Sequence, residues 1–345
     1  MADTLTVRPY RETDRESWDA FVTAQPTGTF FHLTGWREVI ENVFRHRTHY
    51  LVAEAAGAIV GVLPLAEVKT RLFGHAVTSL PFCVYGGCVA DDPAVVAALH
   101  TAAADFARGT GASHLELRNT VEREAAWPRQ DLYVTFRKEI LPEVEANMLA
   151  IPRKQRAMVR KGIKAGLRSE IDPTVDRFFD LYADNVHRHG TPALSKRYFT
   201  ELKRVFGDRC ECLTVVTDDG EPVSGVLSFY FRDEVLPYYA GDYTSARDLA
   251  ANDFKYWELM RLACERGCRV FDYGRSKQGT GSFDFKKNWG FEPTPLHYEY
   301  QLFKVDRIPE NNPLNPKYQL MIRTWRRLPR AVVNALGPHL VRGLG

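Results

Sequence analysis

The chain has 345 residues, of which 45% are hydrophobic and 26% are charged, and its formal net charge is +3. These values are typical of globular proteins, so the composition excludes a disordered or low-complexity chain. The length suits two domains, since most domains have about 100–200 residues. A net charge this small does not by itself predict a nucleic-acid partner.

Two further patterns narrow the class of protein. No apolar run approaches the roughly 18 residues of a membrane-spanning helix, and no basic region followed by an apolar stretch opens the chain, so we expect a cytoplasmic protein. The six cysteines lack the spacing of a zinc site, and we predict no metal. Cys210 and Cys212 share one face of a predicted strand, and Cys264 and Cys268 share one face of a predicted helix. These positions indicate small buried side chains.

In chain order, the first half begins with a short strand and two helices. It continues with hairpin-forming strands and ends with a long helix and two more strands. The long helix begins after Asp91-Asp92-Pro93, because acidic residues and a proline in the first turn are typical of a helix start. The predicted strands cover residues 5–10, 48–55, 59–70, 78–90, 113–119 and 133–141, and the predicted helices begin near residues 14, 35 and 93.

The second half repeats this order and adds a short helix and a last strand. Residues 57–65 and 220–229 also resemble each other locally. A duplicated, hairpin-rich mixed α/β pattern predicts two tandem domains of one fold and is unlike an alternating Rossmann pattern. One large domain with a coincidental similarity is the alternative. The predicted helices cover residues 176–189, 250–267 and 282–290 with one more after Pro192, and the predicted strands cover residues 210–219, 222–231, 234–243, 269–276 and 296–303.

A basic segment lies between the two halves. From Arg153 to Arg168 it carries seven cations and no acidic residue. Arg153, Arg156, Arg160 and Lys164 follow one face of a helix, so they can meet one anionic partner, such as RNA. A solvated helix surface is the alternative.

The last segment, residues 306–345, mixes apolar residues with arginines and forms a basic amphipathic tail. Such a segment can lie on an anionic membrane surface, which would place the protein at the inner face of the membrane. It can equally pack against the first domain. The sequence leaves both interpretations open.

Polar and aromatic residues gather at the ends of two predicted strands, 234–243 and 269–276. Polar residues at strand ends are typical of a functional site, although tight turns capped by tyrosines are the alternative. Asp242 and Asp272 are candidates for positioning an amine or accepting its proton. Two glycines in this region allow a ligand to approach the backbone closely. The candidate donor-binding residues are Tyr239, Gly241, Gly274, Arg275, Ser276 and Phe285.

A glycine-rich loop, Gly279-Thr280-Gly281, opens the short predicted helix that carries Lys286 and Lys287. Backbone N–H groups at such a helix start can bind an anion. A lysine beside them can stabilise the oxyanion that forms when an amine attacks an ester or thioester. By itself a lysine pair is weak support, since most such pairs are solvated.

A series of motifs follows in fixed order through the second half. Tyr-Ala-Gly stands at 239–241, Phe-Asp-Tyr-Gly-Arg-Ser at 271–276 and Phe-Lys-x-x-Trp-Gly-Phe at 285–291. This order resembles the second domain of the Fem-type peptidyl and aminoacyl transferases. The segments 189–192 and 198–199, with the basic tail, resemble more narrowly the Fem-related proteins of exosortase (PEP-CTERM) and exopolysaccharide loci.

The resemblance implies two tandem GNAT-like domains and transfer of an acyl or aminoacyl group to an amine. In that fold the fourth and fifth strands splay apart and the acyl donor enters the gap; here they are the strands 234–243 and 269–276. In Fem proteins the donor is aminoacyl-tRNA, and a cell-wall precursor is bound largely by the first domain. The lysine of the family's Phe-Lys motif matches Lys286, which implies a role at the donor end and in the transition state.

One departure concerns the donor. GNAT proteins that use acetyl-CoA grip its pyrophosphate with an Arg/Gln-x-x-Gly-x-Gly/Ala loop, and residues 247–252 here read Arg-Asp-Leu-Ala-Ala-Asn. The glycines are absent, and Asp248 places negative charge where phosphate would lie. This favours a tRNA-bound or carrier-bound donor. The chain also lacks the long coiled-coil arm of some Fem proteins, which loosens any inference about tRNA contacts.

We therefore predict an acyltransferase whose acceptor is an amine on a cell-envelope or exopolysaccharide precursor. The predicted domains are 1–148 on the acceptor side, 149–305 on the donor and catalytic side, and the tail 306–345. No bound cofactor is expected, because the donor, an aminoacyl-tRNA or an acyl thioester, is a co-substrate. The alternatives are a non-catalytic GNAT-like binding protein and a membrane-surface scaffold. The oligomeric state is not predicted.

Overall fold

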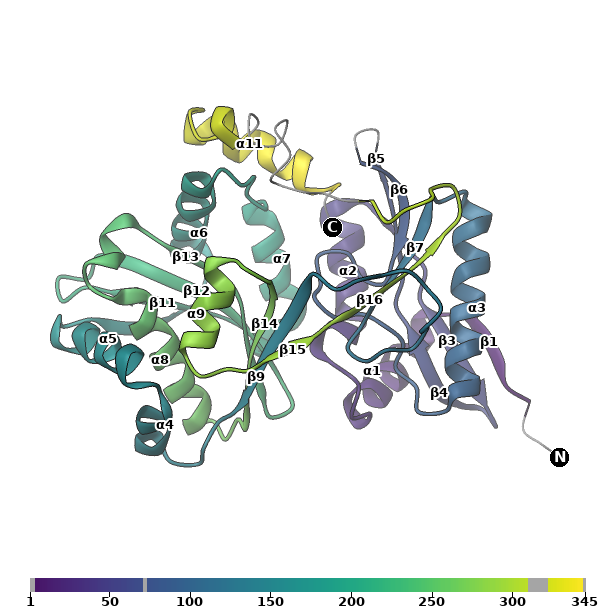
Figure 1. The fold of residues 1–345 in the computed structure, drawn as a ribbon, viewed down its shortest axis with the longest axis horizontal. Helices are drawn as coiled ribbons and strands as arrows, with labels where there is room; N and C mark the ends of the chain where they lie inside the picture. Colours follow the sequence, from purple (N-terminus) through teal and green to yellow (C-terminus); the bar gives the residue numbers. More distant parts are fainter. Residues whose placement is uncertain (1–3, 71–72, 310–321, 344–345) are drawn as a thin grey trace. The chain divides into compact units, whose positions relative to one another are not determined.

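The computed structural model describes residues 4–70, 73–309 and 322–343, and the chain divides into two compact units (Figure 1). Unit 1 consists of Met1–Leu132, Pro295–Asn311 and Arg342–Gly345, and unit 2 of Tyr133–Thr294 and Asn312–Val341. Each unit is a mixed α/β structure, as the sequence predicts.

Unit 1 contains a three-stranded antiparallel sheet of order β1-β3-β4 and a six-stranded sheet of order β2-β5-β6-β7-β16-β8. Its helices are α1 (Arg15–Ala24), α2 (Gly35–Val39) and α3 (Pro93–Thr110), with short helical turns η1 (Glu12–Asp14), η2 (Phe30–His32) and η3 (Ile40–Phe44). Its strands are β1 (Thr6–Pro9), β2 (Arg47–Thr48), β3 (Leu51–Ala55), β4 (Ala58–Leu63), β5 (Ala66–Thr70), β6 (Gly74–Thr78), β7 (His114–Asn119), β8 (Arg129–Gln130) and β16 (His297–Leu302).

The long helix α3 begins and ends where the sequence predicts. Asp92 is its N-cap and accepts a hydrogen bond from the N–H of Ala94 at 2.8 Å, and Pro93 is the first helical residue. Gly111 ends the helix in the left-handed conformation, which glycine adopts at low cost. α3 connects the parallel strands β6 and β7 and buries one face that includes Leu99.

Unit 2 is built on one seven-stranded sheet of order β10-β11-β12-β13-β14-β9-β15 (Figure 1). Its strands are β9 (Tyr133–Glu139), β10 (Arg168–Asp172), β11 (Cys210–Val216), β12 (Pro222–Phe231), β13 (Glu234–Asp242), β14 (Val270–Lys277) and β15 (Pro293–Pro295). Its helices are α4 (Val144–Ala150), α5 (Arg153–Lys164), α6 (Asp176–His189), α7 (Lys196–Phe206), α8 (Ala251–Glu265), α9 (Gly281–Asn288) and α11 (Arg330–Val341), with the turns η4 (Gly207–Arg209) and η5 (Thr244–Arg247).

The two faces of this sheet are covered by different helices. α6 packs on β12 and β13, and α8 packs on the opposite face together with α4, α5 and α9. The hydrophobic core beneath α8 includes Phe254, Trp257, Phe271 and Trp289. As in unit 1, a long helix joins two parallel strands, β13 and β14, so the predicted duplication is visible in the topology.

Two strands belong to the opposite unit from the one expected. β9 was predicted to close the first domain, but it pairs with β14 in the sheet of unit 2. β16 was predicted to close the second domain, but it pairs with β7 in unit 1. The domain limits 1–148 and 149–305 are therefore wrong. A period-2 pattern identifies a strand but not the strand with which it pairs. β9 follows unit 1 in the chain and joins unit 2, and β16 follows unit 2 and joins unit 1.

Most of the described C-terminal tail, including α11, belongs to unit 2, whereas residues 306–309 and 342–343 belong to unit 1. Val333 of α11 is 2% exposed, and Arg330 forms an ion pair with Asp184 of α6 at 3.2 Å. Gly337 lies against the backbone of Ala193. Of the two interpretations left open, packing on the first domain is wrong for α11, which packs on the second, whereas Arg342 beyond it contacts the first, where its carbonyl is 2.7 Å from His46 Nε2. Residues 310–321 of the tail lie outside the described residues, and its membrane contact stays a prediction.

Two further expectations from the sequence concern the cysteines and membrane-spanning helices. All six cysteines are free thiols in buried positions, which confirms their predicted core role, and burial raises the pKa of the Cys264 and Cys268 thiols. Within the described ranges, no helix is both long enough and apolar enough to cross a bilayer.

Candidate functional site

The gap between β13 and β14 is the main feature of unit 2. The two strands pair in parallel only where they begin, at Glu234 with Val270 and Val235 with Phe271. From there β13 runs on to Asp242 and β14 to Lys277 without a ladder between them. The predicted splay is therefore present. Strand edges that do not pair with each other offer backbone N–H and C=O groups to a ligand.

The corresponding strands of unit 1 are arranged differently, because β6 ends where it pairs with β7. β6 and β7 pair only at Val77 with Leu115 and Thr78 with Glu116. The segment after β6 then lies along β7, where the N–H groups of Gly86 and Gly87 donate to the carbonyl of Arg118. The Arg118 guanidinium in turn donates to the carbonyls of Leu80 and Cys83, at 3.2 and 2.7 Å. In unit 1 the segment after β6 therefore continues along β7.

Lys286 of α9 holds the end of β14. Its ammonium donates to three successive carbonyls, those of Tyr273 at 2.7 Å, Gly274 at 3.1 Å and Arg275 at 3.1 Å. The side chain is buried, and burial lowers the pKa of Lys286 to about 7. A lysine has three N–H donors, and all three have partners. Its predicted role at the transition state stays a prediction, and the geometry adds a structural role.

Asp272 is fully buried inside the sheet. One carboxylate oxygen accepts from the Arg137 guanidinium at 3.0 Å, and the other accepts from the N–H of Gly274 at 2.7 Å. Arg137 also pairs with Glu234 at 2.6 Å. These contacts connect β14 to β9 and β13. Asp272 therefore has a structural role beside the gap, and its buried carboxylate is less suited to accept a proton from a substrate.

Asp242 lies at the end of β13 and is the partly exposed member of a buried cluster. Its Oδ1 accepts from Lys255 Nζ at 2.8 Å and from the Ser224 hydroxyl. The Asp242 side chain is 27% exposed, whereas that of Lys255 is 0% exposed. Of the two aspartates predicted as catalytic, Asp242 is the one that a substrate can reach.

Lys255 was not predicted from the sequence, although a signal was present. It lies four residues from both Ala251 and Leu259 in α8, on the face that packs against the sheet. A lysine on an apolar helical face needs a buried partner, and Asp242 provides it. Arg137 was missed for a different reason, because β9 was assigned to the other domain.

Gly241 is required by packing, and its role at a ligand stays a prediction. A Cβ atom at this position would lie 2.4 Å from the backbone N and Cα of Tyr182 in α6. Gly274 is required by its backbone, with a φ of +62° inside the bulge of β14, and nothing lies within 4 Å of its absent Cβ. The predicted close approach at Gly241 is therefore made by α6.

A Gly241→Ala variant tests this assignment. The new methyl group would overlap backbone atoms that cannot rotate away, so we expect a loss of about 3 kcal/mol in the free energy of unfolding. Gly281→Ala is the matched control, because nothing surrounds its Cβ position, and we expect a change within about 0.5 kcal/mol. Urea denaturation measures both. A normal stability with lost donor binding would instead assign Gly241 to the ligand.

The other predicted donor-binding residues have separate partners. The Tyr239 and Tyr198 hydroxyls are 3.0 Å apart, and the Arg275 guanidinium lies over the Tyr133 ring at 4.4 Å. The Ser276 hydroxyl is 2.7 Å from that of Ser282. Phe285 packs in a ring cluster with Tyr256, Tyr273 and Trp289. Tyr239 lies on β13, and Arg275 and Ser276 lie on β14, the strands that flank the gap, whereas Phe285 lies on α9. Their donor binding stays a prediction.

The loop before α8 has an unusual backbone conformation, although it contains no glycine. Ala250 is the N-cap and has a φ of +57°, in the left-handed region that glycine favours. No side chain caps this helix start, so its first N–H groups stay available within the described structure. Asp248, which precedes it, is exposed. The backbone bend therefore exists although the glycines do not.

Ala250→Gly should therefore stabilise the protein by roughly 0.5–1 kcal/mol, since it relieves the left-handed alanine. Ala251→Gly is the control at the neighbouring helical position, where glycine should cost about 1 kcal/mol. Thermal unfolding of the two variants gives the sign of each change. Destabilisation by both would show that the Ala250 methyl group is held by packing.

The basic segment forms α5, one face of which packs on α8. Gly162 lies against Phe254, and Val159 is fully buried. The opposite face is exposed and cationic, and within the described residues its cations have no carboxylate partner. Arg156 donates to the carbonyl of Leu149 and is half-buried. The exposed members of this cationic face are Arg153, Lys154, Arg160, Lys161 and Lys164.

Residues 153–287, which cover most of unit 2, match the family described as acetyltransferase (GNAT) domain. The matched segment includes the splayed strands β13 and β14. A search of curated proteins gives no match for the chain.

Three solved structures are similar to nearly the whole chain. FemX has a TM-score of 0.68 at 16% identity, over 91% of this chain and 100% of that one. A tandem GNAT protein from the clavulanic acid biosynthesis pathway has a TM-score of 0.55 at 13% identity, over 88% and 100%. L-PGS from Bacillus licheniformis has a TM-score of 0.54 at 13% identity, over 91% and 98%. At these identities the likeness shows the fold, which is a tandem GNAT fold.

Proposed function

We propose that unit 2 transfers an acyl or aminoacyl group from an activated donor to an amine, and that the donor's reactive end enters the gap between β13 and β14. The observation that carries this proposal is the splay itself, within a segment that matches a GNAT domain. Unit 1 would supply acceptor contacts, because the segment after β6 lies along β7 there and leaves no comparable splay.

The reaction would need positioning and proton transfer, without a covalent enzyme intermediate. The amine nitrogen attacks the carbonyl carbon of an ester or thioester, the C–O or C–S bond breaks, and the amine loses a proton. Backbone N–H groups on the splayed strand edges suit the developing oxyanion. Asp242 is the accessible carboxylate at this edge and would accept the amine proton.

We further propose that the donor is an aminoacyl-tRNA, and that the acceptor is a precursor of the cell envelope or of an exopolysaccharide. Two observations support a tRNA-bound donor: the unpaired cations on α5, and the exposed carboxylate of Asp248 beside the start of α8. The acceptor rests on the resemblance of the motifs to Fem-type proteins of exosortase loci. The protein would then work at the inner face of the membrane.

The experiment is a binding and transfer panel with charged tRNA, uncharged tRNA, acetyl-CoA and a long-chain acyl-CoA. We expect preference for charged tRNA and an affinity that falls steeply between about 50 and 200 mM salt. A triple variant of the α5 face, Arg153→Gln with Arg160→Gln and Lys164→Gln, should reduce the salt slope by about 1 per lost phosphate contact. Preference for a thioester donor, with no effect of the triple variant, would contradict the tRNA proposal.

A non-catalytic binding protein is the second candidate, and one observation favours it. Lys286 and Asp272, both predicted as catalytic, use their polar groups to hold β14 in place. A binding protein would retain its ligand and show no turnover with any donor. An Asp242→Asn variant separates the two, because only an enzyme would lose turnover while it keeps the ligand.

A further inference from the structure

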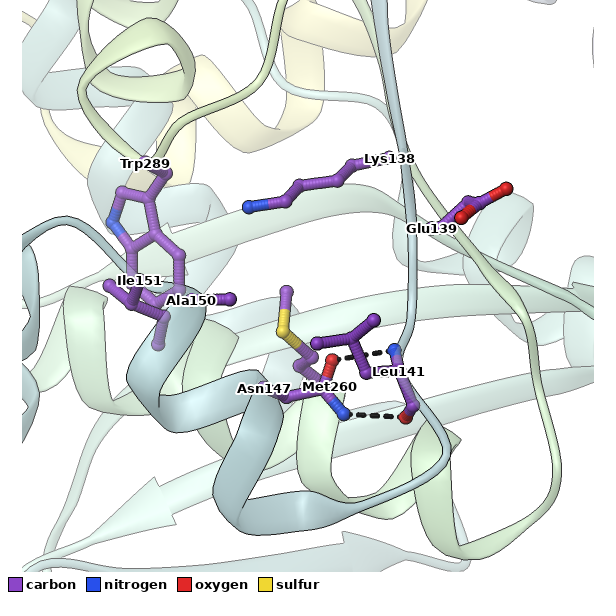
Figure 2. A pocket seen from close by; sticks show the side chains of 8 residues that line it. All are labelled: Lys138, Glu139, Leu141, Asn147, Ala150, Ile151, Met260 and Trp289. Atoms are coloured by element: carbon purple, nitrogen blue, oxygen red, sulfur yellow. Dashed lines mark hydrogen bonds between the residues drawn. The ribbon is translucent and has the colours of Figure 1, made fainter.

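A cavity of about 370 Å³ lies in unit 2, away from the open end of the gap. It is lined by residues of β9, the loop to α4, α4 itself, α8 and the residue after α9, as Figure 2 shows, and it is partly open to solvent. Lys138, which lines it, pairs with Phe271 of β14, where β13 and β14 are still joined. A cavity of this size falls within the range of small-molecule sites, about 300–1,000 Å³.

Most of the cavity wall is apolar, and one cation points into it. Leu141, Ala150, Ile151, Met260 and Trp289 supply the apolar wall. In Figure 2 the Lys138 side chain extends across the cavity toward Trp289, whereas Glu139, its neighbour on β9, points away. This alternation is that of successive residues on a strand.

The Lys138 ammonium has no carboxylate partner among the described residues. The side chain is half-buried, its Nζ lies 5.6 Å from the centre of the Phe291 ring, and burial lowers its pKa. A half-buried ammonium without a counter-ion loses hydration without the compensation of a salt bridge. An anion placed in the cavity would supply that compensation.

The remaining polar groups of the wall are already used. Asn147 accepts from the N–H of Leu141 at 2.8 Å, and it donates to the carbonyls of Leu141 and Glu143, at 2.7 and 3.0 Å. The Trp289 indole N–H donates to Asp253 at 3.0 Å. The Lys138 ammonium is therefore the hydrogen-bond donor in the wall that is available to a ligand.

We propose that this cavity binds an apolar monocarboxylate, with its carboxylate on Lys138 and its hydrocarbon or ring against Ile151, Met260 and Trp289. One ammonium matches one negative charge. A phosphate ester carries up to two charges and needs several donors, which this wall does not provide. The site is separate from the gap between β13 and β14, so it can bind a ligand whether or not the proposed transfer occurs there.

The test uses the full-length protein and decanoate as the probe, with affinity measured by isothermal titration calorimetry. Lys138→Met removes the charge and keeps the length of the side chain. Ala150→Trp fills the cavity from an exposed position, so it should fold even if the first variant does not. Lys287→Met is the matched control, because it removes an exposed lysine outside the cavity. Decanol and decyl phosphate test the charge of the ligand, and indole-3-acetate tests an aromatic body.

We expect decanoate or indole-3-acetate to bind the wild type and Lys287→Met equally, and at least tenfold more weakly to Lys138→Met and Ala150→Trp. Decanol and decyl phosphate should each bind at least tenfold more weakly than decanoate. Absence of carboxylate binding would overturn the proposal, as would unchanged affinity in Ala150→Trp. Decanol or decyl phosphate binding as tightly as decanoate would overturn the assignment of a monocarboxylate.

Discussion

Replacing Lys286 with methionine is expected to lower the free energy of unfolding of unit 2 by about 3 kcal/mol, because it strips a shared donor from three carbonyls at the end of β14. Transfer activity should fall with it, since β14 forms one wall of the gap. Lys287→Met, the exposed neighbour, should change stability by no more than about 0.5 kcal/mol. Urea denaturation and single-turnover transfer, measured on the same preparations, give both effects.

The two roles of Lys286 separate when activity is measured under conditions where the variant stays folded. A structural role predicts that activity recovers as stability is restored, for example by a bound acceptor that stabilises the fold. A variant with wild-type stability and no turnover would contradict the structural role and assign Lys286 to the transition state.

The pH dependence of this effect has a defined sign. The pKa of Lys286, about 7, is lower than that of an unfolded lysine, so the unfolded chain binds more protons above pH 7. The wild type should therefore gain stability relative to Lys286→Met as the pH rises from about 7 to 10. A difference that shrinks with pH would show that the three carbonyls hold the ammonium form more strongly than burial disfavours it.

The sequence predicts the fold of this protein further than it predicts its site. Hydrophobic periodicity and caps such as Asp92-Pro93 place the helices, and the duplicated order predicts the tandem architecture. The exchange of β9 and β16 between the units was not predicted, because alternation along a strand carries no information about its partner. Only long-range pairing, which a single sequence does not encode locally, decides it.

For the candidate site, the sequence predicts the strands that carry the residues, and the structure adds their contacts. The resemblance implies where the two strands splay, and the structure places Asp242 at the end of β13 and Lys286 against Gly274 of β14. Their partners decide what they do, and those partners come from distant segments. The Asp272 carboxylate accepts a hydrogen bond from Arg137, and the backbone of α6 packs against Gly241. The residue types at strand ends therefore indicate where the candidate site lies, and the hydrogen bonds of each residue indicate its role.

Asp242 and Lys255 should respond very differently to removal, although they form one ion pair. Asp242→Ala leaves the Lys255 ammonium without its partner at 0% exposure, and we expect a loss of about 3–5 kcal/mol in stability. Lys255→Met leaves a carboxylate that is 27% exposed and still accepts from Ser224, so its loss should be less than half as large. The double variant should resemble Lys255→Met, because no unpaired charge remains.

The transfer rates of these three variants should follow a different order from their stabilities. If Asp242 accepts the amine proton, Asp242→Ala and the double variant should lose at least about 10²-fold in rate, and Lys255→Met should retain a functional carboxylate. Single-turnover transfer rates of the three variants, set beside their denaturation curves, measure this. An equal loss of rate in all three would assign the pair to the scaffold of β13, because a scaffold depends on the contact and a proton acceptor depends on the carboxylate alone.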